Sequence, residues 1–225
     1  MTRVLVVYYS SYGHTHEMAK AVADGAKSVA GTEVLLRRVP ELADARRAMS
    51  TQEAYVRAQE AQQDVPEVTL DDLRSADGVA WGTPTRYGNM AAQLKQFIDT
   101  TGELWQQGAL EDRATGVFTS TATTHGGSET TILTTMVTLL HLGMVLCGSP
   151  YGQNPAIMTD EGVGGSPYGP STIAGPDGSR TPVDDELETA RNLGSRIARV
   201  AAALKVMRES GEEDVTKLLR RGRAA

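Results

Sequence analysis

Apolar residues along this chain are arranged in two alternating kinds of segment. Five short, mostly apolar runs are typical of strands that are buried on both faces of a parallel sheet. These runs occupy residues 3–9, 33–39, 77–83, 114–120 and 144–148. Between and after them, apolar residues recur every three or four positions, as on the buried face of a helix. We therefore expect alternating strands and helices.

The predicted helices follow four of the five runs. Met18, Val22 and Ala26 form the apolar stripe of the first, and Gly31 ends that segment. Further helices are expected around Leu94–Ile98, from Ser128 to about Leu142, and at about 184–208. This alternation predicts a flavodoxin-like α/β fold, a doubly wound five-stranded parallel sheet of order 2-1-3-4-5 with helices on both faces.

Two segments do not fit the alternating pattern. Residues 41–65 are rich in Ala, Gln, Arg and Glu and are predicted to form a surface helix or a partly mobile insert. Residues 149–182 are rich in Gly and Pro, show no periodicity and are too long for an ordinary connection. Such a segment is either mobile or packed on a partner, and we favour a partner. The domain is expected to span 1–208, followed by a charged tail at 209–225.

Composition excludes several classes of protein. The chain has 225 residues, 22% of them charged, and a net charge of −6, which disfavours a nucleic-acid binder. The apolar start is too short for a signal peptide and no run approaches the roughly 20 residues of a membrane helix. Cys147 has no second cysteine to pair with, which favours the cytoplasm, and no Cys/His cluster has zinc spacing. We therefore expect no metal site.

The predicted sheet order also places the site. In open α/β sheets, ligands bind beyond the carboxyl ends of the strands, where the winding direction reverses. For this order the first and third strands flank that point. The loops that begin at Ser10, at Thr83 and, next door, at Ser120 are therefore the candidates.

Each of the three loops has a composition that suits a ligand. Residues 10–15, Ser-Ser-Tyr-Gly-His-Thr, combine hydroxyls and a glycine with a helix N-terminus, which can hold a phosphate dianion without Lys or Arg. A plain strand-to-helix turn is the alternative. Residues 82–90 place Arg86 and Tyr87 between Pro84 and Gly88, which suits a flat aromatic ligand. Hydroxyls and glycines at 120–127 allow close backbone approach.

Taken together, these residues resemble the WrbA family of FMN-dependent NAD(P)H:quinone oxidoreductases, which have a flavodoxin-like fold. The resemblance extends to about residue 205. It is carried by residues 4–15, Arg-Val-Pro-Glu at 38–41, Gly-Thr-Pro-Thr-Arg-Tyr-Gly-Asn-Met at 82–90, Gly-Ser-Pro-Tyr-Gly at 165–169 and Ser-Thr-Ile-Ala-Gly-Pro-Asp-Gly-Ser-Arg at 171–180. In this family the 149–182 segment helps to build a homotetramer whose active sites are lined by neighbouring chains.

The resemblance implies specific roles for individual residues. Tyr12 would also lie near the NAD(P)H path, and Trp105 would lie beside the quinone pocket, although a core or interface tryptophan is the alternative. Three groups of residues would bind FMN. The first would bind its phosphate, the second its ring and ribityl chain, and the third the far side of the ring. These groups are Ser10, Ser11, Tyr12, Gly13, His14 and Thr15; Pro84, Thr85, Arg86, Tyr87 and Gly88; and Ser120, Thr121, Ala122, Thr123, Thr124, His125 and Gly126.

One residue departs from the family pattern in a way that affects the site. The family often has two adjacent histidines before Gly-Met, whereas this chain has Leu140-His141-Leu142-Gly143-Met144. His141 is a candidate catalytic residue, with a structural histidine as the alternative. A helix that follows the fourth strand ends at the edge of the sheet opposite the ligand. If His141 reaches a flavin, we expect that flavin to belong to another subunit.

The function that this resemblance implies is two-electron transfer from NAD(P)H through FMN to a quinone. Both substrates would use one exposed face of the ring, so ping-pong kinetics are expected. A flavodoxin-type electron carrier is the first alternative, although such a carrier usually lacks a segment like 149–182. A regulatory or nucleic-acid-associated protein is the second alternative. The one basic cluster of this chain, at 220–223, follows acidic residues, and such a charge pattern is typical of a solvated tail.

Overall fold

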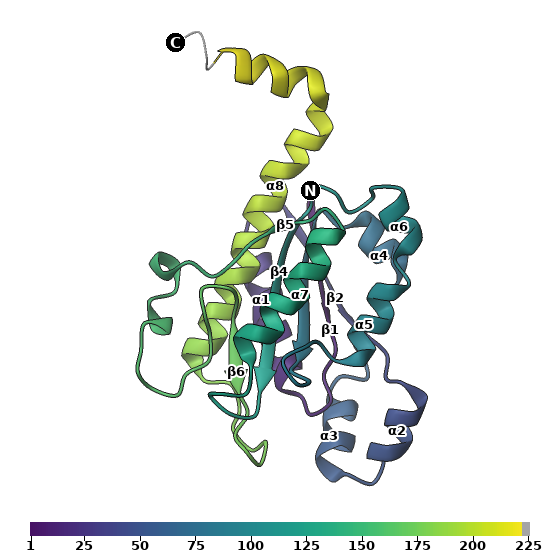
Figure 1. Cartoon of the computed structure of the whole chain (residues 1–225), viewed down its shortest axis with the longest axis vertical. Helices are drawn as coiled ribbons and strands as arrows, with labels where there is room; N and C mark the ends of the chain where they lie inside the picture. The colour runs from purple at the N-terminus through teal and green to yellow at the C-terminus, as the bar shows by residue number, and fades with distance from the viewer. Residues whose placement is uncertain (222–225) are drawn as a thin grey trace.

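One parallel sheet lies at the centre of the molecule (Figure 1). Its strand order is β2-β1-β3-β4-β5. The computed structural model describes the backbone of residues 1–221 and the side chains of residues 1–210. The first four strands lie within one or two residues of their predicted ranges. They are β1 (Thr2–Tyr8), β2 (Thr32–Arg38), β3 (Gly78–Pro84) and β4 (Ala114–Thr121). The predicted order and fold class are confirmed.

Alternate side chains of β1 enter two separate apolar cores. Val4, Val6 and Tyr8 point to one face of the sheet, and Leu5 and Val7 point to the other. Side chains on a strand alternate between the two faces, and helices cover both. All five side chains are fully buried, which is why this segment reads as one continuous apolar run.

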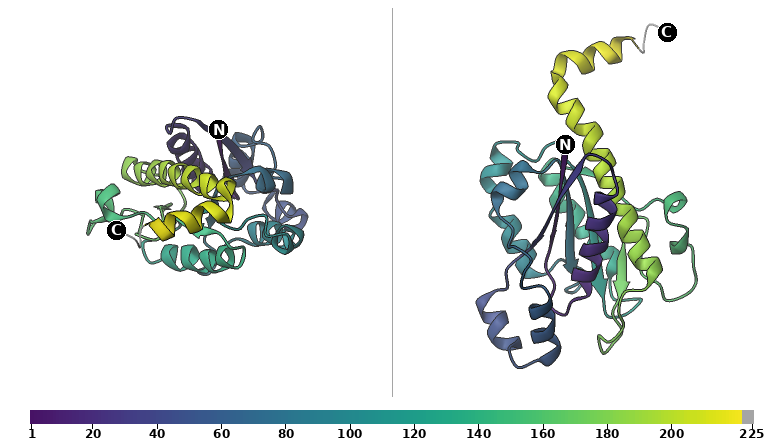
Figure 2. Two further views of the ribbon diagram at one scale, coloured as in Figure 1. Left: turned by 90° about the horizontal axis from the view of Figure 1, so that it is seen from above. Right: turned by 180° about the vertical axis from the view of Figure 1, so that it is seen from behind.

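The helices form one layer on each face of the sheet. Viewed from behind, α1 (His14–Lys27) and α8 (Asp184–Arg221) lie side by side on one face (Figure 2). Leu73, Leu94, Leu104 and Ile132 supply the core of the other face. The helices that contribute these residues are α4 (Leu70–Ser75), α5 (Ala92–Asp99), α6 (Gly102–Gln106) and α7 (Ser128–His141). The short helices α4 and α6 were not predicted.

Two glycines allow α1 and α8 to approach each other closely. A Cβ atom added to Gly25 would lie 1.9 Å from the backbone oxygen of Arg191. A Cβ added to Gly194 would lie 1.9 Å from the backbone oxygen of Val22. Because these neighbours are backbone atoms, a side chain at either glycine could be accommodated only if one of the two helices moved.

The fifth position of the sheet is filled by two strands instead of one. β5 (Val145–Leu146) pairs with the start of β4, and β6 (Ser171–Ile173) pairs with its end. The strand predicted at 144–148 is therefore shorter than expected. Residues 147–170 leave the sheet after β5, and the chain returns to the same position as β6. This excursion contains the short 3-10 helices η1 (Tyr151–Gln153) and η2 (Pro155–Ile157). The 149–182 segment is thus built into the sheet rather than lying wholly outside it.

Two other segments differ from expectation. Residues 41–65 form two helices, α2 (Ala43–Met49) and α3 (Glu53–Ala61), beside the carboxyl ends of the strands (Figure 1). Helix α8 continues to Arg221 instead of ending near 208, so most of the predicted tail is helical, and residues 222–225 lie outside the described part. No helix in the described part of the chain combines the length and apolar character needed to cross a bilayer.

Candidate functional site

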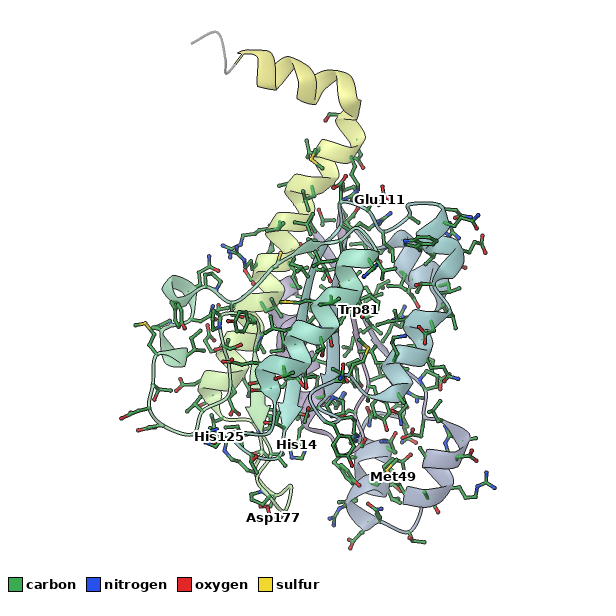
Figure 3. All side chains as sticks on the ribbon, viewed as in Figure 1. His14, Met49, Trp81, Glu111, His125 and Asp177 are labelled. Atoms are coloured by element: carbon green, nitrogen blue, oxygen red, sulfur yellow. The ribbon has the colours of Figure 1, made fainter. Side chains whose placement is uncertain are left out.

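The three candidate loops meet at the carboxyl edge of the sheet, as predicted. Between them lies a pocket of about 520 Å³. His14, Asp177 and Met49 come from three distant segments and gather at this edge (Figure 3). The pocket is lined by Tyr12, His14, Gln52, Ala54, Pro84, Thr85, Arg86, Ser120, Thr121, Ala122, Ala174, Gly175, Pro176, Asp177 and Gly178.

The first loop ends in a helix N-terminus with free backbone donors. Gly13 precedes α1 with φ of 94°, a left-handed conformation that favours glycine. Its N–H donates to Ser10 Oγ at 3.1 Å. The helical ladder starts with Glu17 N donating to Gly13 O, so the amides of residues 14–16 have no partner within the helix. These amides and the positive end of the helix dipole suit an anion.

The hydroxyls of the first loop connect it to the other two loops. Thr15 Oγ1 forms a 3.0 Å hydrogen bond with Ser120 Oγ, and both residues are buried. Arg86 donates from one guanidinium nitrogen to Ser11 Oγ at 3.0 Å and from another to the carbonyl of Thr85. The three loops are therefore one hydrogen-bonded unit, although the sequence predicted only that they are neighbours.

Helix α3 holds the first loop from behind, a role that the sequence reasoning missed. Gln59 Nε2 donates to the carbonyls of Ser10 and Ser11 at 3.0 and 3.1 Å. Gln62 Nε2 donates to the same Ser10 carbonyl at 3.0 Å. Tyr12 donates to Gln52 Oε1 at 2.7 Å. Amides three residues apart share one face of a helix, and this spacing was the available signal.

A buried polar network continues from this loop into the protein. Tyr9 donates to Glu41 Oε2 at 2.6 Å and accepts hydrogen bonds from Ser11 Oγ and Gln93 Nε2. Tyr55 also donates to Glu41, at 3.3 Å. Burial and the neighbouring Glu41 carboxylate raise the pKa of Tyr9. Tyr9 therefore remains a neutral donor that braces Glu41.

The second loop contains a tight turn that presents an aromatic ring. Arg86 and Asn89 exchange two backbone hydrogen bonds, and φ is positive at both central residues, 54° at Tyr87 and 76° at Gly88. This is the pattern of a type I′ turn, which is unusual for a bulky residue. The Tyr87 side chain is fully exposed. Helix α7 supports the turn, because Thr134 Oγ1 donates to the carbonyl of Gly88.

The third loop is divided between two pockets. Ser120, Thr121 and Ala122 line the 520 Å³ pocket described above. Thr124 and His125 instead line a neighbouring pocket of about 440 Å³ at the start of α7. Residues 123–126 form a turn in which Gly126 N donates to the carbonyl of Thr123.

Residues 174–178 form a further wall of the larger pocket that the sequence reasoning did not assign. They follow β6 directly, and Ala174 N donates to the carbonyl of Thr121 at 2.7 Å. His14 Nε2 lies 3.1 Å from the carbonyl of Gly178, so the wall also reaches the start of α1. The Ala-Gly-Pro-Asp-Gly sequence was already visible as part of the motif at 171–180, but a motif alone does not show which pocket it lines.

A buried tyrosine–histidine pair lies beneath the first loop. The Tyr8 hydroxyl is 2.6 Å from His16 Nδ1, and both side chains are buried. Burial lowers the pKa of His16, and the charge of Lys20 lowers it further. His16 is therefore held in its neutral form, with Tyr8 as its partner.

Two predicted site residues lie away from the pocket within a single chain. Trp105 is on α6 and His141 ends α7, and both helix ends lie at the amino edge of the sheet, opposite the pocket (Figure 1). Trp105 is 61% exposed. Neither residue can meet a ligand in the pocket of its own chain. Roles for both residues therefore require a second copy, as the sequence already indicated for His141.

Comparisons with known proteins agree with this architecture. Residues 2–154 match the model of the NADPH-dependent FMN reductase family. The chain is 50% identical over 204 residues to an NAD(P)H dehydrogenase (quinone) of Geotalea uraniireducens, covering 90% of this chain and 98% of the relative. It is 52% identical over 202 residues to the protein of the same name from Syntrophobacter fumaroxidans, with coverage of 90% and 98%.

A solved structure is also similar over the whole domain. It is the WrbA-like flavodoxin from Agrobacterium tumefaciens, with a TM-score of 0.63 and 27% identity, covering 90% of this chain and 99% of that one. The sheet order, the three loops at one edge and these matches lead to one assignment. The chain belongs to the NADPH-dependent FMN reductase family, among relatives named NAD(P)H dehydrogenase (quinone).

Proposed function

We propose that this protein is an NAD(P)H:quinone oxidoreductase that binds FMN in the 520 Å³ pocket. The observation that carries the proposal is the position of the α1 N-terminus. His14, the first residue of this helix, lines the same pocket as Pro84 and Ser120, where an open α/β sheet binds its ligand. The names of the relatives support the same chemistry.

The donor set at the first loop fits the phosphate of FMN. A phosphate dianion would accept hydrogen bonds from the amides of residues 14–16 and gain from the helix dipole. The carbonyls of Ser10 and Ser11, which would repel an anion, are bound by Gln59 and Gln62 on the α3 side. Helix α3 therefore helps to present a surface of donors to the phosphate.

The rest of the pocket fits a flat ring with polar edges. Pro84, Ala122, Ala174 and Pro176 supply apolar surface, and Thr85, Arg86 and Asp177 are among the polar residues that line the pocket. Such a mixture of apolar walls with few polar groups is typical of cofactor pockets. We propose that residues 84–88 and 120–122 hold the ring and that the Tyr87 ring stands at the rim. Thr124 and His125, which the family resemblance also assigns to the ring, line the neighbouring pocket.

FMN, when bound, would supply the two-electron chemistry between the nicotinamide and the quinone. The chain would bind and orient the reactants. Tyr12 lies at the pocket and is held by Gln52, so we propose that it guides the nicotinamide. Because donor and acceptor would use the same opening of the pocket, they would bind in turn, which gives ping-pong kinetics.

We further propose that the active form is a homotetramer in which Trp105 and His141 reach the site of a neighbouring copy. Support comes from exposed apolar side chains on one helix, because Leu133, Val137 and Leu140 are each more than 40% exposed on α7. Such a row of apolar residues is typical of an interface. Mixed oligomers of a Trp105→Ala chain and an Arg86→Ala chain should be more active than oligomers of either variant alone.

The cytoplasm is the compartment that we propose for this chemistry. The single cysteine, Cys147, is buried and free in the described structure. Burial raises the pKa of its thiol, which makes it an unreactive apolar side chain rather than a redox group. Absence of disulfides is usual for proteins in a reducing compartment.

Quinone-dependent oxidation of NADH and NADPH by the purified protein, measured with and without added FMN, tests the proposal. Turnover with benzoquinone that requires FMN is the expected result. Tight FMN binding with negligible turnover would instead identify an electron carrier. If FMN does not bind, the assignment of the pocket is wrong.

A further inference from the structure

We propose that Glu186 and Arg180 are positioning residues for the cofactor, because they fix the wall of the pocket formed by residues 174–178. The proposal rests on the FMN pocket assigned above. Neither residue lines the pocket, so neither is a catalytic residue. Both act through the backbone of the segment between β6 and α8.

The wall is a short excursion that needs an anchor at its far end. It leaves the sheet at Ala174, whose N–H bonds to β4, and it contains two glycines with positive φ, Gly175 at 83° and Gly178 at 73°. Arg180 N donates back to the carbonyl of Ala174 at 2.9 Å and closes the loop. Glycines allow many backbone conformations, so the position of this wall depends on what holds Arg180.

The Arg180 side chain is held by a carboxylate with no solvent exposure. Its guanidinium lies 3.0 Å from Glu186 Oε1, and Glu186 is 0% exposed. The same guanidinium nitrogen donates to the carbonyl of Ile173. Arg180 thus connects the start of α8 to the end of β6, and the wall lies between these two anchor points.

Glu186 also gathers the segments on either side of the wall. Its Oε1 accepts from Gly164 N at 2.9 Å and from Ile173 N at 3.3 Å. Its Oε2 accepts from Thr172 Oγ1 at 2.7 Å and from Val183 N at 3.0 Å. Both oxygens therefore face only donors, as a buried carboxylate requires. One side chain joins the 147–170 excursion, β6 and the first turn of α8.

The close fit around this carboxylate limits what can replace it. A Cβ added to Gly164 would lie 2.3 Å from the backbone oxygen of Ser171, so the excursion runs directly against β6. In a Glu186→Gln chain, one carboxylate oxygen becomes an NH₂ group that points at donors. The neighbouring backbone must then move, and the wall at 174–178 moves with it.

The opposite edge of the sheet offers a matched control. Asp77 is a buried carboxylate that also holds α8, accepting from Lys205 Nζ at 3.0 Å and from an Arg208 guanidinium nitrogen at 2.9 Å. Asp77→Asn makes the same chemical change as Glu186→Gln, at a residue that contacts the same helix but lies far from the pocket. Comparison of the two variants separates a general loss of stability from a displacement of the pocket wall at 174–178.

The experiment measures FMN affinity by quenching of flavin fluorescence, with urea unfolding of each apoprotein measured in parallel. We expect Glu186→Gln to raise the Kd for FMN about tenfold or more, since small displacements of a binding wall are costly. Asp77→Asn should change that Kd by less than about twofold, within the range of an indirect effect. If Glu186→Gln does not fold, Arg180→Gln replaces it with the same expected rise.

Two outcomes overturn the inference. One is a Glu186 or Arg180 variant that binds FMN as tightly as the unsubstituted protein. The other is an equal loss of affinity in Asp77→Asn, which would reduce the effect to general stability. Failure of the unsubstituted protein to bind FMN is a different result, because it overturns the proposed function itself.

Discussion

The side chain of Gln62, at the end of α3, donates to the backbone carbonyl of Ser10, 52 residues earlier in the chain. Gln62 is only 3% exposed, and its amide also donates to the carbonyl of Ala58. Because Gln59 binds the same Ser10 carbonyl, the two glutamines form a clamp on the loop before α1. Residues 41–65 are therefore part of the candidate site and not a surface addition.

Replacement of Gln62 by leucine should weaken both folding and FMN binding. The substitution removes two buried hydrogen bonds, each worth about 1 kcal/mol, and partly frees the Ser10 carbonyl beside the phosphate position. We expect the free energy of unfolding to fall by about 1–2 kcal/mol and the Kd for FMN to rise several-fold. Urea unfolding and fluorescence quenching measure the two effects. Gln63→Leu, at the exposed neighbouring position, is the control and should change neither.

Arg86 should contribute to binding through the loops that it joins. Arg86→Met keeps much of the side-chain length but removes the donors to Ser11 Oγ and to the carbonyl of Thr85. We expect the Kd for FMN to rise about tenfold, because a hydrogen bond from a charged group is worth about 1.5–3 kcal/mol. Unchanged affinity in Arg86→Met would show that the first two loops hold their positions independently.

Stability should fall on mild acidification because of His16. Its pKa is lowered in the folded protein by burial and by Lys20, whereas it is about 6.5 in an unfolded chain. Just below pH 6.5 the unfolded chain therefore binds more protons at this site, so stability decreases as the pH falls. Unfolding by urea at pH 7.5 and at pH 5.5 should show this loss. A His16→Gln variant should lose less stability over the same interval, and an identical loss in both proteins would contradict the prediction.

Asp77 should affect the free energy of unfolding at a lower pH than His16 does. Burial alone would raise the pKa of Asp77, but the hydrogen bonds from Arg3 N and Lys205, with the charges of Lys205 and Arg208, hold it below its usual value. The stabilisation is present above pH 4 and is lost as the pH falls through the folded-state pKa. Asp77→Asn should cost about 1–3 kcal/mol at pH 7. This difference between variant and parent should shrink when unfolding is measured below pH 4.

The contact between α1 and α8 should not tolerate a side chain at Gly194. In Gly194→Ala the new Cβ would meet the backbone oxygen of Val22 at 1.9 Å, and the two helices must separate. We expect a loss of about 3 kcal/mol in the free energy of unfolding, at the upper end of the range for overpacked cores. Gly102→Ala on α6, where no atom lies within 4 Å of the added Cβ, should be neutral or slightly stabilising.

The apolar pattern along the chain is enough to predict the fold class, the order of the strands and the edge of the sheet that carries the site. Continuous apolar runs such as 3–9 report burial on both faces, and alternation with helices leads to a parallel sheet. The carboxyl ends of parallel strands meet at one edge. Loops that are 70 residues or more apart in the chain, such as those at Ser10 and Thr83, can therefore be grouped from the apolar pattern alone.

The side chains that hold those loops in place cannot be predicted in this way, because they come from segments far away in the chain. Gln62 forms a hydrogen bond with Ser10, and Glu186 forms hydrogen bonds with Gly164 and Thr172. The periodic pattern of apolar residues gives no sign of these contacts. The interruption of the fifth strand between Leu146 and Ser171 depends in the same way on long-range pairing with β4. The apolar period of a segment shows which of its faces is buried. A hydrogen bond between residues far apart in the chain depends instead on how the helices pack.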